Sequence, residues 1–116
     1  MQPEVEKYLV DILASAEMLL SRLSGVNSFE EFQGIDELVK DGILRRLSII
    51  GEAIYQINKL DKEIALKDKK KIAGLRHIIV HDYDKVDEIL IYAVVKRHLP
   101  ELRNEVLEKL NSKKGK

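Results

Sequence analysis

Apolar residues recur at every third or fourth position along three long stretches of the chain, the spacing that places side chains on one face of an α-helix. These stretches are residues 5–23, 36–60 and 87–110. Gly25 ends the first stretch, and Asp87 is the expected N-cap of the third. Since no segment alternates apolar and polar residues as a strand does, the pattern predicts an all-α protein.

The connections between these stretches carry weaker signals. Residues 25–35 predict a short helical turn, because an Asn-Ser pair precedes two glutamates in the manner of a capping box. Residues 61–71 are dense in charge and predict a solvated loop with a helical turn. Residues 70–80 predict a further helix with Ile72 facing inward.

Three residues inside the predicted helices disfavour regular helical structure. Gly42 and Gly51 each lower helix propensity by up to about 1 kcal/mol relative to alanine, so we expect each to mark a close contact with a neighbouring helix. Pro100 lacks a backbone donor and is expected to kink the last helix.

Length and composition indicate one globular domain. The chain has 116 residues, of which 45% are hydrophobic and 34% are charged, and this is not the composition of a disordered protein. We predict a single domain over residues 1–110, folded as an up-and-down bundle of four to five helices. Residues 111–116 are expected to form a flexible basic tail.

Charge and cysteine content exclude several function classes. The 20 basic and 20 acidic residues cancel, so nucleic-acid binding would have to use a local patch. The absence of cysteine excludes disulfides, thiolate nucleophiles and cysteine-ligated metals. No apolar run approaches the length of a membrane span, and the acidic N-terminus is unlike a signal peptide. We therefore expect a soluble, cytoplasmic protein.

The reactive side chains concentrate in one strip, residues 74–87, with the sequence GLRHIIVHDYDKVD. It holds Arg76, His77, His81 and Tyr83 together with three aspartates. Three interpretations of this strip compete. The simplest is the solvated, charged end of an ordinary helix.

A metal site is the second interpretation. His77 and His81 are four positions apart and share one helical face, with Asp84 about one turn further. Two imidazoles and a carboxylate suit zinc or iron. Against this, the sequence HDYD resembles a helix end, and neither Glu52 nor His98 stands out as a ligand from another helix. We predict no metal and no other cofactor.

Metal-free phosphate chemistry is the third interpretation. RNA is cut when its own 2′-hydroxyl attacks the neighbouring phosphate, which needs a base, an acid and a cation to hold the extra negative charge. Histidine titrates near neutral pH, and arginine offers a fixed fork of donors to phosphate oxygens. Arg76 and His81 are separated by roughly 140° on an ideal helix, so they converge only if the arginine is extended or the helix ends near His81.

The octet from Arg76 to Tyr83 resembles the Arg-x4-His-x-Tyr motif of the HepT-like toxins, a branch of the HEPN superfamily of small helical ribonucleases. The segment RRLSIIGEAIYQINK, residues 45–59, is similar to the part of that family with Gly-Glu-Ala on its core helix. Length and helix order agree as well, so the resemblance covers most of the chain.

The resemblance implies a homodimer in which the motifs of both subunits line one cleft. His81 would act as general acid or base, and Arg76 would bind the phosphate and stabilise the transition state. His77 occupies the position after the arginine, where relatives often have asparagine, and would orient the site by hydrogen bonding.

The same resemblance implies a partner protein. HepT-like toxins are typically encoded beside an MntA-like nucleotidyltransferase antitoxin, which attaches AMP to the motif tyrosine, here Tyr83. A nucleotide there would put bulk and negative charge where RNA phosphates must lie. The alternative for Tyr83 is an aromatic side chain that fills the end of the bundle with its hydroxyl in water.

Other residues have supporting roles in this hypothesis. Glu52 interrupts an apolar helical face and is either an exposed flank or a buried acid paired with a base such as Arg76, and family members carry glutamate here. Its expected role is positioning. A lysine cluster before the motif would contact RNA or simply be solvated: Lys67, Lys69, Lys70 and Lys71.

The sequence therefore predicts a HepT-type endoribonuclease toxin that cuts RNA without a metal and is neutralised by AMPylation. The alternative is a non-catalytic helical module that binds a nucleotide or a nucleotidyltransferase partner and cuts nothing.

Overall fold

The computed structural model of the chain describes residues 1–64, 66, 72, 74 and 87–114. The regular elements of this part are all helical, which confirms the predicted all-α fold class. None of the described helices is both long and apolar enough to cross a membrane. The elements are α1 (Pro3–Arg22), α2 (Phe29–Gln33), α3 (Glu37–Leu60), α5 (Glu88–Ala93), the π-helical turn η2 (Val94–His98) and α6 (Leu99–Lys114).

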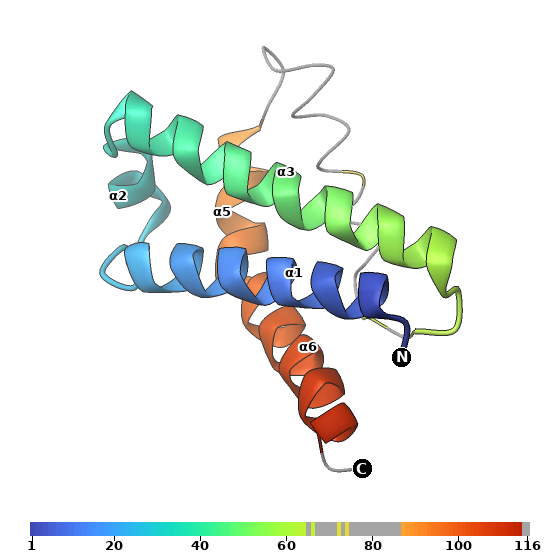
Figure 1. The fold of residues 1–116 in the computed structure, drawn as a ribbon. Helices are drawn as coiled ribbons and strands as arrows, with labels where there is room; N and C mark the ends of the chain where they lie inside the picture. The colour runs from blue at the N-terminus through green and yellow to red at the C-terminus, as the bar shows by residue number, and fades with distance from the viewer. Residues whose placement is uncertain (65, 67–71, 73, 75–86, 115–116) are drawn as a thin grey trace.

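Helix α1 lies at the centre of the described bundle. It runs antiparallel to α3, and the two helices lie side by side in Figure 1. The segment from α5 to α6 passes behind this pair, and α6 packs against α1. Within the described chain, α1 is thus the helix that packs against both other long ones.

The buried residues of α1 follow the predicted stripe. Val5, Leu9, Ile12, Ala16 and Leu19 are almost completely inaccessible to solvent. In α3 the buried stripe consists of Ile43, Leu47, Ile50, Ala53, Ile54 and Ile57. These faces supply most of the hydrophobic stabilisation, since burying one large aliphatic side chain contributes about 1.5–3 kcal/mol.

The apolar spacing also put Leu38 and Ile89 on the inward faces of their helices, beside Val39 and Leu90, yet both are exposed. Leu38 in the first turn of α3 is 80% exposed, and Ile89 in the first turn of α5 is 63% exposed. Val39 and Leu90 are the members of these pairs that pack against the core. Ile72, outside the long helices, is buried as predicted.

Helix α2 begins with the reciprocal hydrogen bonds that its sequence predicted. Ser28 Oγ accepts from the Glu31 amide at 3.1 Å, and Glu31 Oε2 accepts from the Asn27 amide at 2.9 Å. The rings of Phe29 and Phe32 lie 6.0 Å and 5.6 Å from the ring of Tyr92, so aromatic contacts hold α2 against the segment that begins at α5.

The helix around Pro100 continues through a wide turn. Before the proline, the Leu99 amide donates to the Val94 carbonyl five residues earlier, as in a π-helix. The expected disturbance at Pro100 therefore takes the form of this π-turn, η2. Helix α6 then extends to Lys114, so residues 111–114 of the expected tail are helical.

The two glycines of α3 differ in their surroundings. Gly51 is buried. Gly42 is exposed, and a Cβ atom added there would meet nothing within 4 Å. The close helix contact expected at Gly42 is therefore absent from the described structure.

Candidate functional site

The predicted catalytic pair, Arg76 and His81, lies in residues 75–86, outside the part of the chain that the structure describes. His77 and Tyr83 lie in the same range. The three lysines of the predicted RNA contact also lie outside the described residues: Lys69, Lys70 and Lys71. The described structure instead shows how the chain is held directly after this segment and where other polar groups gather.

Asp87 is the first described residue after residues 75–86, and its own hydrogen bonds hold it at the start of α5. Its Oδ1 atom accepts from the Ile89 amide at 2.9 Å, and its carbonyl accepts from the Ile91 amide at 3.1 Å. This is the N-cap that the sequence predicted. The N-cap of α5 is therefore defined, and it lies only four positions after Tyr83 in the sequence.

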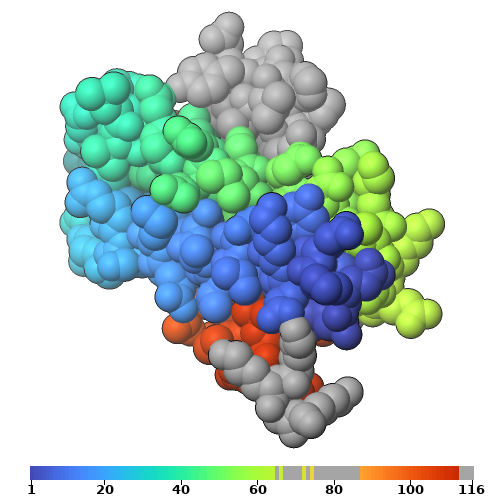
Figure 2. All heavy atoms as spheres, viewed as in Figure 1, coloured from blue at the N-terminus to red at the C-terminus, as the bar shows by residue number. Residues whose placement is uncertain are grey.

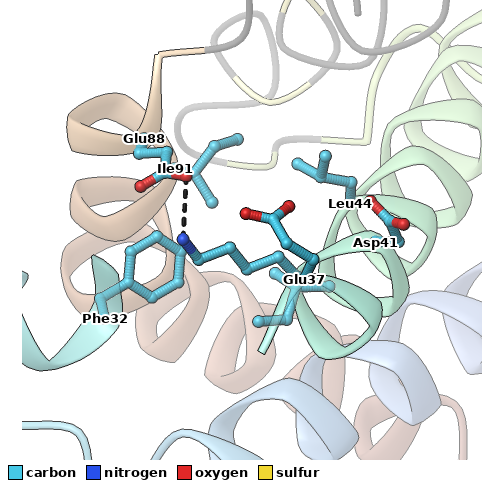
Figure 3. Close-up of a pocket in the computed structure, with 8 residues that line it drawn as sticks. Phe32, Glu37, Asp41, Leu44, Glu88 and Ile91 are labelled. Carbon is cyan, nitrogen blue, oxygen red and sulfur yellow. Dashed lines mark hydrogen bonds and ion pairs between the residues drawn. The ribbon is translucent and has the colours of Figure 1, made fainter. Parts of the chain in front are cut away.

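Lys40 ties the start of α5 to two other elements. From α3, its Nζ atom donates to Glu88 Oε1 at 3.1 Å, the contact drawn as a dashed line in Figure 3. The same atom donates to the Gln33 carbonyl, at the end of α2, at 2.8 Å. The lysine side chain is only 12% exposed, whereas the Glu88 side chain is 39% exposed and Gln33 lies at the surface.

A hollow of about 150 Å³ lies beside this contact, between α3 and α5. Glu37, Asp41 and Glu88 stand around it in Figure 3. Three carboxylates against one lysine make this hollow a poor place for RNA phosphates. In the described part of the chain no group of three or more histidines and carboxylates is arranged to hold a metal ion.

Glu52 is the one predicted site residue that the structure describes. It is half-buried on α3; its Oε1 atom accepts from Gln56 Nε2 at 2.9 Å, and its Oε2 atom is shielded from solvent. It is thus neither a fully exposed flank nor a fully buried acid. The expected pairing with Arg76 lies outside the described residues.

Glu52 also lines a hollow of about 350 Å³ on the α1–α3 side of the molecule. Tyr8 and Asp11 contribute from α1, and Arg45 and Ser48 contribute from α3. The mixture of one arginine and two carboxylates offers both donors and acceptors to a polar ligand.

A third hollow, of about 270 Å³, lies between the C-terminal half of α1 and the N-terminal half of α3. Arg22 and Arg46 line it together with Met18, Val39 and Gly42, and the lining from the described part of the chain holds no carboxylate. Sequence analysis missed both arginines, because they are far apart in the chain and only the packing of α1 on α3 brings them together.

Comparison with known proteins connects the chain to ribonucleases. A family model described as Ribonuclease HepT-like matches residues 12–108, which include both the Arg76–Tyr83 octet and Glu52. No solved structure shows a significant match.

Three relatives have similar sequences. A protein named "Putative RNase" from Caldanaerobacter subterraneus subsp. tengcongensis is 36% identical over 108 residues, covering 92% of this chain and 95% of the relative. One with the same description from Methanocaldococcus jannaschii is 33% identical over 104 residues, covering 89% and 94%. A third, named "Gamma-glutamylcyclotransferase and putative RNase", from the same archaeon, is 32% identical over 112 residues, covering 93% of this chain and 48% of the relative. From the extent of the family match and of these alignments, we conclude that the chain belongs to the Ribonuclease HepT-like family of the HEPN superfamily.

Proposed function

We propose that this protein is a metal-independent endoribonuclease in which Arg76 and His81 carry out the cleavage. The observation that carries the proposal is the Arg-x4-His-x-Tyr sequence of residues 76–83, which lies inside the segment matched by a ribonuclease family. No other part of the chain places an arginine, two histidines and a tyrosine within eight residues.

The proposed chemistry is transfer of the phosphate within the RNA strand. The 2′-hydroxyl loses its proton to a general base, its oxygen forms a bond to phosphorus, and the bond to the 5′-oxygen of the next nucleotide breaks. A general acid then protonates the leaving oxygen. His81 fills one of these proton-transfer roles, and the guanidinium of Arg76 binds the phosphate oxygens as negative charge builds.

Two subunits complete this proposed site. A single histidine cannot act as general base and as general acid in the same step. A second His81, from a partner copy, would therefore fill the remaining role. His77 and Glu52 are proposed to orient the pair. The hydrogen bond between Glu52 and Gln56 supports a positioning role, because it fixes one oxygen of the carboxylate on α3.

We further propose that the protein is the toxin of a toxin–antitoxin pair. An MntA-like nucleotidyltransferase would attach AMP to the Tyr83 hydroxyl, and the added phosphate would repel the RNA backbone. Lys69, Lys70 and Lys71 are proposed RNA contacts, since phosphate contacts dominate RNA affinity.

The experiment that tests the nuclease proposal is cleavage of mixed cellular RNA by the purified, unmodified protein in excess EDTA. The wild type is expected to cut, whereas Arg76→Ala and His81→Ala are each expected to lose activity at least about a hundredfold, the usual contribution of a general acid or base. His98→Ala is the matched control, because it removes a histidine of η2 outside the strip and should keep cutting.

A second substrate separates this chemistry from hydrolysis by water. An RNA oligonucleotide whose cut site carries a single 2′-deoxy nucleotide should resist cleavage there, since the attacking oxygen is missing. Equal cleavage of both oligonucleotides, or full activity of His81→Ala, would refute the proposed mechanism. If the wild type cuts nothing while mass spectrometry finds Tyr83 unmodified, the protein is a binding module.

A further inference from the structure

The hollow between the ends of α1 and α3 has a charge pattern that differs from its surroundings. We call it the arginine groove and define it by its lining residues, Met18, Leu19, Arg22, Val39, Gly42, Ile43 and Arg46. Figure 2 shows the face on which α1 and α3 lie side by side, in blue and green. Arginines from both helices line the groove.

Both guanidinium groups of the groove are available to a ligand. Among the residues that the structure describes, neither Arg22 nor Arg46 takes part in a hydrogen bond or an ion pair. Other basic side chains do have carboxylate partners: Arg103 lies 3.4 Å from Glu17, and Lys40 lies 3.1 Å from Glu88. Since none of the described residues that line the groove is a carboxylate, its described lining is locally positive in a chain with no net charge.

The rest of the groove is apolar and open. Met18 is 51% exposed, and Val39 is half-buried. A Cβ atom added to Gly42 would meet nothing within 4 Å, so the helix surface there leaves room for a ligand. The groove therefore offers two forked cations beside an uncharged surface, which suits a molecule with both phosphates and flat apolar faces.

From this arrangement we infer that the arginine groove binds single-stranded RNA, with backbone phosphates on Arg22 and Arg46 and a base against Met18 and Val39. The inference rests on the proposed ribonuclease function and names a part of the substrate path. Arginine pairs with phosphate through two parallel hydrogen bonds, single-stranded RNA can splay its bases out, and the face of a base is favourably removed from water against an apolar side chain. Among the described lining residues the guanidiniums are the only polar side-chain groups, so binding should follow the backbone and not the base sequence.

The hollow that Glu52 lines, also formed by α1 and α3, suggests where the bound strand would continue. Arg45 directly precedes Arg46 on α3 and lines the hollow that also contains Tyr8, Asp11 and Glu52. A strand that leaves the arginine groove along α3 therefore meets another arginine beside Glu52. The proposed phosphate contacts thus lead toward a residue that we expect to position the catalytic pair.

The test is an affinity measurement that does not depend on cleavage. A fluorescein-labelled twelve-nucleotide oligouridine with 2′-O-methyl groups cannot be cut by its own 2′-oxygen, and its fluorescence anisotropy reports binding. The double variant Arg22→Gln/Arg46→Gln is expected to bind at least tenfold more weakly than the wild type at low salt. In a plot of log affinity against log salt concentration, the slope for this variant should be shallower by about 1.4. Each phosphate contact of a single strand contributes about 0.7 to that slope, and two contacts are lost.

Two variants serve as controls. Arg103→Gln removes one positive charge from a side chain that does not line the groove and that pairs with Glu17, and it should keep wild-type affinity. Arg22→Lys/Arg46→Lys keeps both charges, so its salt dependence should be close to that of the wild type. Its affinity should lie between those of the wild type and the glutamine variant, since lysine lacks the planar fork of arginine. Equal losses in the Arg103 variant and in the groove variant would overturn the inference, because the effect would then be general charge.

The remaining outcomes separate this inference from the proposed function. His81→Ala should keep its affinity for the oligonucleotide while losing cleavage. If the wild type cuts RNA and the groove variant binds as tightly as the wild type, the groove inference fails and the nuclease proposal stands. A groove variant that changes molar mass in light scattering would show that a second copy covers this face, which also overturns the inference. No binding by the wild type would overturn the groove inference, whereas the cleavage assay decides the nuclease proposal by itself.

Discussion

Lys40 joins three elements of the fold with a single side chain. Its ammonium group accepts no hydrogen bond and has three protons to donate, of which one goes to Glu88 and one to the carbonyl that ends α2. The carbonyl contact also places a positive charge at a helix C-terminus, where the helix dipole favours it.

Replacement of Lys40 by methionine should lower the free energy of unfolding by about 1–2 kcal/mol. The estimate combines one charge-assisted hydrogen bond to a backbone carbonyl with an ion pair whose acid is 39% exposed and therefore contributes little by itself. Urea unfolding followed by circular dichroism measures the change.

Arg103→Met is the matched control for Lys40→Met. Its contact with Glu17 is longer, at 3.4 Å, and both side chains are more than a third exposed, so it should change stability by less than about 0.5 kcal/mol. Equal effects of the two substitutions would mean that the lysine acts as one more surface charge. The double variant Lys40→Met/Glu88→Gln should lose less than the sum of the two single variants, because the pair interacts.

At the scale of elements, the start of α5 depends on one cap. Asp87 is the first described residue after the undescribed segment that carries Arg76 and His81, and its side chain provides the acceptor for the Ile89 amide. Removing that acceptor leaves a helix N-terminus with one fewer partner.

We expect Asp87→Ala to destabilise the protein by about 1 kcal/mol, whereas Asp87→Ser should remain close to the wild type because serine is an equivalent cap. Hydrogen exchange at the Ile89 amide should accelerate in the alanine variant only. If both variants exchange at the same rate, the side chain is not the cap in solution.

Sequence patterns predicted the elements better than the contacts between them. The three-and-four spacing gave α1 and α3 almost residue by residue, and short-range rules gave the caps at Ser28 and Asp87, since both depend on neighbours in the chain. The same spacing placed Leu38 in the core, although it is 80% exposed, because periodicity defines a face but not how far a neighbouring element covers it.

The candidate site residues also fall into those that lie close together in the sequence and those that only the fold brings together. Arg76 and His81 could be proposed as site residues from the sequence because they lie within one short strip, and they remain a prediction. Arg22 and Arg46 could not, since they come from different helices and their common environment depends on the packing of α1 on α3. That the described lining around them holds no acid is likewise a property of the folded surface, which a net charge of zero conceals.

For the whole molecule, the proposed site requires two copies of the chain. Light scattering should then give about twice the mass of the 13.3 kDa chain. Assembly alone does not show that both histidines are used, because a dimer could hold two independent sites.

A mixing experiment distinguishes these arrangements. Wild-type chains and His81→Ala chains are unfolded together, refolded and assayed for RNA cleavage at several ratios. If one cleft needs both histidines, activity follows the square of the wild-type fraction and an equal mixture retains about a quarter of it, since random pairing gives that share of wild-type dimers. A linear decline would show that each subunit cuts by itself.

The π-turn η2 has a consequence for changes in chain length. A π-turn uses about one residue more than an α-turn, so the helix that runs from Glu88 to Lys114 contains one surplus residue next to Pro100. Loss of an exposed residue such as Arg97 can be absorbed there by reversion to α-helical geometry, with Ile91 and Leu102 still facing the core. The same deletion inside α1 or α3 would rotate every following side chain by roughly 100° and expose a buried stripe. Among the long helices described here, the last one thus has a turn, η2, that can absorb a one-residue deletion, whereas α1 and α3 have none.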